Sequence, residues 1–148
     1  MQKFKELWLD FETYSACDIE EQGGMAYALH TSTSMLCLGY AFDDQPAKII
    51  RGIDDLPKDV ELYVQDHGKV LAHNATFDYR IWNYVCTEQL GWPALSLDQV
   101  VDTMAVCLTF QIPAKLAEAG AALRVKHQKN PEGKKLIKMC CQPDARGK

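Results

Sequence analysis

The chain has 148 residues, of which 47% are hydrophobic and 24% are charged. This composition excludes a disordered, collagen-like or coiled-coil protein and suits one domain with one sizeable core. The longest apolar run, Met35 to Phe42, is too short to cross a bilayer, and the first residues lack the apolar segment of a secretory signal. We therefore expect a cytoplasmic protein with no membrane partner. The six cysteines form no Cys-x-x-Cys pair, which predicts reduced and mostly buried thiols.

The net charge of −4 hides an uneven distribution along the chain. Residues 1–123 contain 8 Lys or Arg and 18 Asp or Glu, giving −10, whereas residues 124–148 contain 8 Lys or Arg and 2 Asp or Glu, giving +6. An acidic body is a poor passive binder of nucleic acid unless carboxylates hold divalent cations. The basic end is either a solvated segment, which charge alone favours, or a contact for a phosphate backbone.

The N-terminal third predicts a three-stranded meander. Glu6 to Thr13 alternates apolar and polar residues, which indicates a strand with Asp10 and Glu12 on one face. Ser15 to Ser34 is predicted as a long loop with at most one helical turn. Met35 to Phe42 is predicted as a buried strand, and Ala47 to Arg51 as a third strand after a turn.

The middle of the chain alternates helices and short strands. Leu56 to Gln65 has apolar residues at helical spacing, and Val70 to His73 forms a short apolar run typical of a buried strand. Phe77 to Leu90 is predicted as a helix that ends at Gly91, and Leu97 to Val101 as a short strand. A meander followed by α/β crossovers predicts a mixed sheet flanked by helices on both faces, an α/β fold.

The C-terminal third predicts short helices over Thr103–Phe110 and Ala114–Leu123, separated at Pro113. From Arg124 onward the chain is polar and basic, with at most one helix near Glu132 to Cys141. We therefore divide the chain into a single domain, residues 1–123, and a basic extension of the same domain, residues 124–148, for which we expect some disorder.

Two acidic segments are candidates for a functional site. Asp10 and Glu12 are two residues apart on a strand, so both carboxylates project from one face, repel each other and favour a compensating Mg²⁺ or Mn²⁺. A polar strand face that meets water explains the same pattern. Asp78 follows the strand that ends at His73; with Thr76 as N-cap, it lies in the first turn of a helix, where the helix dipole also favours an anion.

The sequences Asp10-Phe11-Glu12-Thr13 and His73-Asn74-Ala75-Thr76-Phe77-Asp78 together resemble the first two motifs of the DEDD superfamily of 3′–5′ exonucleases, which have the ribonuclease H-like fold. The wider segments Leu9–Ser15, Met35–Phe42, Asp102–Met104 and Lys129–Ile137 are similar to the proofreading domain of phage-type family A DNA polymerases. This resemblance covers nearly the whole chain.

The resemblance implies a site and a reaction. Asp10, Glu12 and Asp78 would be catalytic and would hold two divalent ions, Mg²⁺ or Mn²⁺, that clamp the scissile phosphate. Thr13, Asn74 and Phe77 would line the substrate site, although for Asn74 and Phe77 a turn or packing role is an equal alternative. The reaction would release nucleoside 5′-monophosphates from the 3′ end of single-stranded DNA, with the polymerase domain of a longer parent protein as partner.

One part of the family pattern is missing. The family has a fourth carboxylate on a late helix, in a Tyr-x-x-x-Asp or His-x-x-x-Asp pattern, but after Leu123 the only Asp is Asp144, with Cys140 four positions earlier. Asp102 is expected to cap a helix close to the site without being that ligand. The chain thus resembles an exonuclease truncated before its third motif, and we expect weakened or absent activity.

Three interpretations remain open. The chain is either an exonuclease or a non-catalytic prophage remnant that keeps the fold and weak affinity for metal or nucleic acid. A small ribonuclease of the same superfamily is a third interpretation, which the polymerase-like segment Glu132-Gly133-Lys134 disfavours. For His73, hydrogen bonding at the end of a strand is favoured over a role as catalytic base, and for Trp82, a place in the core is favoured over base stacking.

Overall fold

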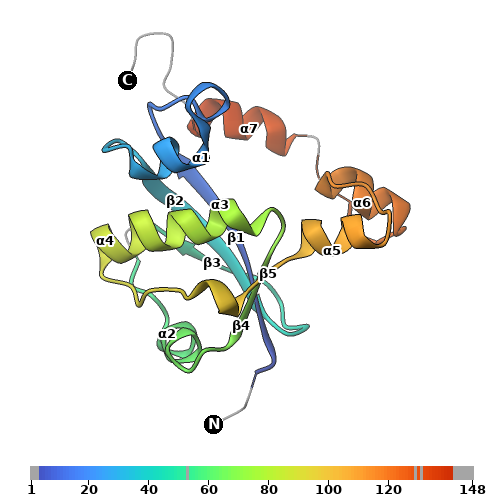
Figure 1. The fold of residues 1–148 in the computed structure, drawn as a ribbon, viewed down its shortest axis with the longest axis horizontal. Coiled ribbons are helices and arrows are strands. Elements are labelled where there is room, and N and C mark those ends of the chain that lie inside the picture. Colours follow the sequence, from blue (N-terminus) through green and yellow to red (C-terminus); the bar gives the residue numbers. More distant parts are fainter. Residues whose placement is uncertain (1–3, 53, 129, 131, 142–148) are drawn as a thin grey trace.

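The computed structural model describes residues 4–52, 54–128, 130 and 132–141. Its centre is a five-stranded sheet in the order β3-β2-β1-β4-β5. β1 (Glu6–Tyr14), β2 (Ser34–Phe42) and β3 (Lys48–Arg51) pair antiparallel, whereas β4 (Lys69–Ala72) and β5 (Val100–Asp102) run parallel to β1. The predicted mixed sheet, built from a meander and α/β crossovers, is confirmed (Figure 1).

Short helices connect and follow the strands (Figure 1). Because α3, a π-helical turn and α4 follow one another without a break, they form the single helix expected after β4. The helices are α1 (Ile19–Leu29), α2 (Lys58–Gln65), α3 (Ala75–Ile81), the π-helical turn Trp82–Cys86, α4 (Thr87–Leu90), α5 (Thr103–Thr109), α6 (Leu116–Ala122) and α7 (Gly133–Cys140). In the described part of the chain, no helix is long and apolar enough to cross a membrane.

The alternating pattern of β1 places its apolar residues on one face of the sheet. Leu7, Leu9 and Phe11 are buried, and the register pairs them with Phe42, Tyr40 and Leu38 of β2 on the same face. Residues of α1, α2 and the α3–α4 helix complete this core, with Trp82 fully buried as expected. The core residues from these helices are Tyr27, Ala28, Val60, Val64, Ile81, Trp82, Val85 and Cys86. Side chains on the opposite face are therefore the ones left for a functional site.

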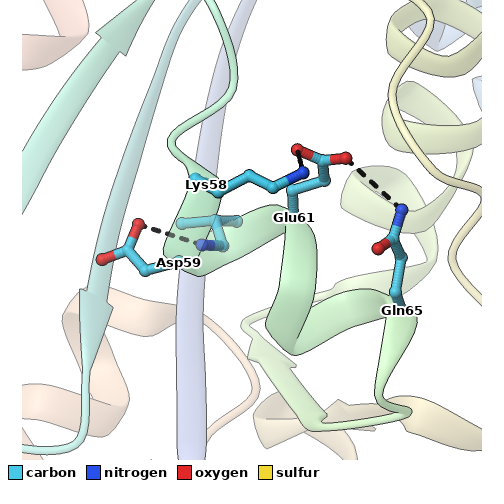
Figure 2. A network of polar contacts seen from close by, with 5 residues as sticks. Lys58, Asp59, Glu61 and Gln65 are labelled. Carbon is cyan, nitrogen blue, oxygen red and sulfur yellow. Dashed lines mark hydrogen bonds and ion pairs between the residues drawn. The ribbon is translucent and has the colours of Figure 1, made fainter. Parts of the chain in front are cut away.

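Local polar contacts fix the surface of α2 (Figure 2). Lys58 Nζ lies 2.9 Å from Glu61 Oε2, Gln65 Nε2 donates to Glu61 Oε1, and Asp59 accepts a hydrogen bond from the backbone N–H of Val60. Such exposed pairs contribute little to stability. Burial of apolar side chains, not this network, therefore holds α2 on the sheet.

Two predicted elements differ from the structure. The segment predicted as a loop before β2 contains α1, which Asp18 caps by accepting hydrogen bonds from the N–H groups of Glu20 and Glu21. Gly23, with a φ of 81°, divides α1 into two short helical pieces, so its apolar spacing is irregular. The predicted strand Leu97–Val101 begins as a 3₁₀ turn, Leu97–Gln99, and only Val100–Asp102 pairs with β4.

Candidate functional site

Asp10 and Glu12 lie on the face of β1 that points away from the core. Their neighbours Leu9, Phe11 and Thr13 are buried, whereas Asp10 is exposed and Glu12 half-buried. Both carboxylates therefore reach the less covered face of the sheet, as the sequence predicts. Both also have contacts within the molecule.

Asp78 contacts β1 beyond the point where the pairing of β1 with β4 ends. β4 pairs with β1 only from Glu6 to Trp8, so the edge of β1 beyond Trp8 is not paired with a strand on that side. α3 follows β4, and its Asp78 fills this gap: the carboxylate Oδ1 accepts a hydrogen bond from the backbone N–H of Phe11 at 3.2 Å. The second acidic segment thus meets β1 at the residue between Asp10 and Glu12.

Asp78 is only 6% exposed. Burial raises its pKa to about 7, the hydrogen bond from Phe11 opposes this rise, and the nearby charges of Asp10 and Asp102 add to it. A buried carboxyl that feels two further carboxylates is costly to ionise without a neighbouring positive charge. The electrostatics therefore favour either a proton on Asp78 or a cation beside it.

Two thiols lie near Glu12, a feature that the sequence did not predict. Cys37 of β2 is paired with Glu12 in the sheet register, so the two side chains share a face. The thiol of Cys141, the residue after α7, lies 3.9 Å from Glu12 Oε2 and donates toward it. Burial and the charge of Glu12 raise the pKa of both thiols, so the neutral forms are favoured.

Asn74 and Asp102 join the ends of β4 and β5. Asn74 lies in the left-handed region, with a φ of 66°, and its N–H donates to Asp102 Oδ1 at 3.0 Å. The same oxygen accepts the N–H of Met104, which confirms Asp102 as the N-cap of α5. The predicted N-cap Thr76 is wrong: α3 begins at Ala75 after Asn74, because the turn is held by the Asp102 carboxylate and not by a side chain of its own segment.

Thr13 and Phe77 contact the same tyrosine of α1. The Thr13 hydroxyl lies 2.8 Å from the Tyr27 hydroxyl, and the rings of Phe77 and Tyr27 are 6.0 Å apart between centroids. Thr13 is buried, and its hydroxyl is held in the hydrogen bond with Tyr27. A contact of either residue with substrate stays a prediction.

His73 is a structural bridge at the end of β4. Its Nδ1 lies 3.1 Å from Thr103 Oγ1, and its Nε2 lies 2.7 Å from the carbonyl oxygen of Ala114. Since both ring nitrogens have partners in the protein, the favoured interpretation of a hydrogen-bonded histidine is supported. The ring ties the start of α5 to the segment that leads into α6.

Two observations bear on whether the candidate site can hold a divalent cation. The donors are carboxylates, which suit Mg²⁺ or Mn²⁺, and the charge of Asp10 already acts on Asp78. Across residues 4–52, 54–128, 130 and 132–141, however, no three His, Cys, Asp or Glu side chains are grouped closely enough to hold a metal ion. The carboxylate oxygens therefore suit a divalent cation, but Asp10, Glu12 and Asp78 would have to move closer to one another to bind it.

Comparison with curated proteins finds a similar DNA polymerase. The chain is 33% identical over 144 residues to a DNA polymerase of Bacillus phage SP02, and the match covers 94% of this chain. The chain is thus similar in sequence to part of a phage DNA polymerase. It spans about a fifth of that polymerase, 21% of its length. No family model matches the chain.

Solved structures with a similar fold include a DNA polymerase and a nuclease. The family B DNA polymerase of the archaeon Pyrobaculum calidifontis matches with a TM-score of 0.56 and 15% identity, over 93% of this chain and 22% of the polymerase. A nuclease in its apo form matches with a TM-score of 0.51 and 15% identity, over 84% of this chain and 54% of the nuclease. At this identity the likeness shows the fold alone, which is consistent with the ribonuclease H-like fold that the sequence predicts.

Proposed function

We propose that this chain is a 3′–5′ exonuclease domain of the DEDD superfamily, of the kind attached to phage-type family A DNA polymerases. Its substrate would be the 3′ end of single-stranded DNA. The observation that carries the proposal is the docking of Asp78 against β1 between Asp10 and Glu12, in a chain homologous to a DNA polymerase. The two segments that resemble the first two exonuclease motifs are thereby adjacent in space.

In this proposal the three carboxylates hold two divalent cations, Mg²⁺ or Mn²⁺. The cations would supply an activated water and neutralise the charge that develops on the phosphate. Asp10 and Glu12 offer oxygens from one face of a rigid strand, and Asp78 offers them from the start of α3. Asp102 fixes the β4–α3 turn through the N–H of Asn74 and thereby sets the direction of α3 toward β1.

We also propose that the activity is weak. After Leu123, no Tyr-x-x-x-Asp or His-x-x-x-Asp pattern occurs in the sequence, and Asp144 lies outside the described residues. One group that lies beside Glu12 is the thiol of Cys141. A thiol that stays neutral provides neither the negative charge of a fourth carboxylate nor a base for the attacking water.

The test is release of mononucleotides from a single strand with a label at its 3′ end, in the presence of Mn²⁺. We expect slow release that Asp10→Ala abolishes and that Glu88→Gln leaves unchanged, because Glu88 is an exposed carboxylate on α4 and is not one of the three candidate ligands. Absence of release at high protein and metal concentration would reject an active enzyme. A matched RNA strand, degraded faster than DNA, would favour the ribonuclease interpretation.

A second candidate is a binding domain without catalysis. It is favoured by the absence of a three-residue metal cluster in the described part of the chain. Titration calorimetry with Mn²⁺ separates the two: two bound ions support the enzyme, whereas one or none supports the binding domain. The polymerase part of a longer protein is a proposed partner in both cases, because the homologous polymerase is about five times as long as the match.

A further inference from the structure

The charge distribution poses a difficulty for any polynucleotide ligand. Residues 1–123 carry a net charge of −10, so most of the molecule repels a phosphate backbone. Binding of a single strand needs cationic side chains that track the phosphates. The positive charge is concentrated in residues 124–148, which carry +6.

The structure brings part of this basic segment to the candidate site. Cys141 follows α7 directly, and its thiol contacts Glu12. Cys141 also acts electrostatically on Tyr27 of α1, so the end of α7 lies close to both α1 and the end of β1. In Figure 1, α7 (orange-red) lies next to α1 at the end of the molecule opposite the N-terminus.

α7 is short and rich in lysine, with the sequence GKKLIKMC. At a rise of about 1.5 Å per residue, its eight residues span about 12 Å, so each lysine position lies within that distance of Cys141 along the axis. Lys135 is exposed, as are Lys126 and Arg124 in the segment before α7. The two ion pairs found among the described residues use Lys58 and Lys115 instead. Lys135 is therefore an exposed cation on the helix that ends beside Glu12, and Arg124 and Lys126 are exposed in the segment that packs against α6.

We propose that residues 124–128 and 132–141 form a phosphate-binding wall for a single-stranded polynucleotide whose 3′ end lies at Asp10, Glu12 and Asp78, with Lys126 and Lys135 among the contacts. This inference rests on the proposed function and names the part of the chain that holds the strand. The acidic body holds the reacting end, and the basic segment holds the phosphates that precede it. In this arrangement, negative side chains lie at the reacting end and positive side chains lie along the preceding phosphates. One acidic surface cannot provide both.

The experiment is fluorescence anisotropy of the full chain with a labelled oligodeoxythymidylate, in EDTA to prevent cleavage, over a range of salt concentrations. The slope of log K against log salt reports the number of phosphates neutralised, at about 0.7 per contact for single strands. We expect Lys126→Gln and Lys135→Gln each to weaken binding and to reduce the slope by about 0.7. Lys58→Gln on α2, whose ammonium is paired with Glu61, is the matched control and should leave the slope unchanged.

The outcomes separate the inference from the proposed function. If the wild-type chain binds the strand and both Lys126→Gln and Lys135→Gln keep its slope, the phosphate-binding wall is wrong while the substrate class stands. If Lys58→Gln lowers the slope as much as the other two, the contacts are diffuse and the wall is again wrong. If the wild-type chain binds no strand at low salt, the single-stranded substrate of the proposed function fails as well.

Discussion

The carboxylate of Asp78 accepts the backbone N–H of Phe11 across 67 positions of the sequence, and this bond joins α3 to the centre of β1. The bond replaces a strand partner, because β4 pairs with β1 only as far as Trp8. It also fixes the spacing between two acidic segments that are remote in sequence. A single side chain thus serves both the fold and the candidate site.

The first prediction concerns the pH dependence of stability in EDTA. The folded pKa of Asp78, about 7, lies above its ordinary value of 3.8, so between these values the folded state keeps a proton that the unfolded chain releases. The free energy of unfolding therefore falls as the pH rises from about 4 to about 7. Asp78→Asn keeps an acceptor for the N–H of Phe11 and removes this loss. We expect the variant to exceed the wild type by about 2–4 kcal/mol at pH 8 and to differ little at pH 4.

Urea unfolding at both pH values measures this difference. Glu88→Gln, which changes an exposed carboxylate, serves as the control and should follow the wild-type curve. If the free energies of unfolding of the variant and of the wild type change equally between the two pH values, Asp78 is already ionised in the folded protein at low pH.

The second prediction concerns Asp102. Its Oδ1 accepts two backbone N–H groups, from Asn74 and Met104, and so caps α5 while holding the turn before α3. Asp102→Ala should lower the free energy of unfolding by about 1–2 kcal/mol. Asp102→Asn keeps the acceptor oxygen and should recover most of this loss. Thermal unfolding of the three proteins is the measurement, and equal losses in both variants would assign the effect to charge rather than to capping.

The third prediction contrasts two glycines of the β2–β3 region. A Cβ added at Gly52 would lie 2.1 Å from the backbone oxygen of Met35, so Gly52→Ala must shift a strand. A Cβ added at Gly39 would lie 3.7 Å from the Asp10 oxygen, an ordinary contact. We expect Gly52→Ala to destabilise the protein by more than 2 kcal/mol, in the range of steric overpacking, and Gly39→Ala to be nearly neutral. Similar midpoints in denaturant unfolding for the two variants would contradict this contrast.

The strands were predictable because their signal is local. Alternation in β1 fixes which face Asp10 and Glu12 share, and that face follows from the sequence alone. The same local logic predicted α3 with Asp78 in its first turn. Sequence reasoning therefore predicted the two segments of the candidate site, the strand face that Asp10 and Glu12 share and the place of Asp78 in the first turn of a helix.

Features that depend on tertiary contact were not predictable. α1 was missed because Gly23 interrupts its helical spacing, and only its Asp18 cap gave a local signal. The capping of the β4–α3 turn by Asp102 and the contact between Cys141 and Glu12 join residues that are 28 and 129 positions apart. No local pattern contains such pairs, since they form only when the elements pack.

The last prediction concerns divalent cations and Asp78. If Mn²⁺ binds at Asp10, Glu12 and Asp78, it must displace the proton from Asp78, whose pKa is about 7. The rise in melting temperature with added Mn²⁺ should therefore be larger at pH 8 than at pH 6, because at pH 6 protons compete for the carboxylate. Differential scanning fluorimetry measures this rise, Asp10→Asn should abolish it, and Glu88→Gln should leave it unchanged. An equal rise at both pH values, or one that Asp10→Asn retains, would place the bound ion elsewhere on this acidic protein.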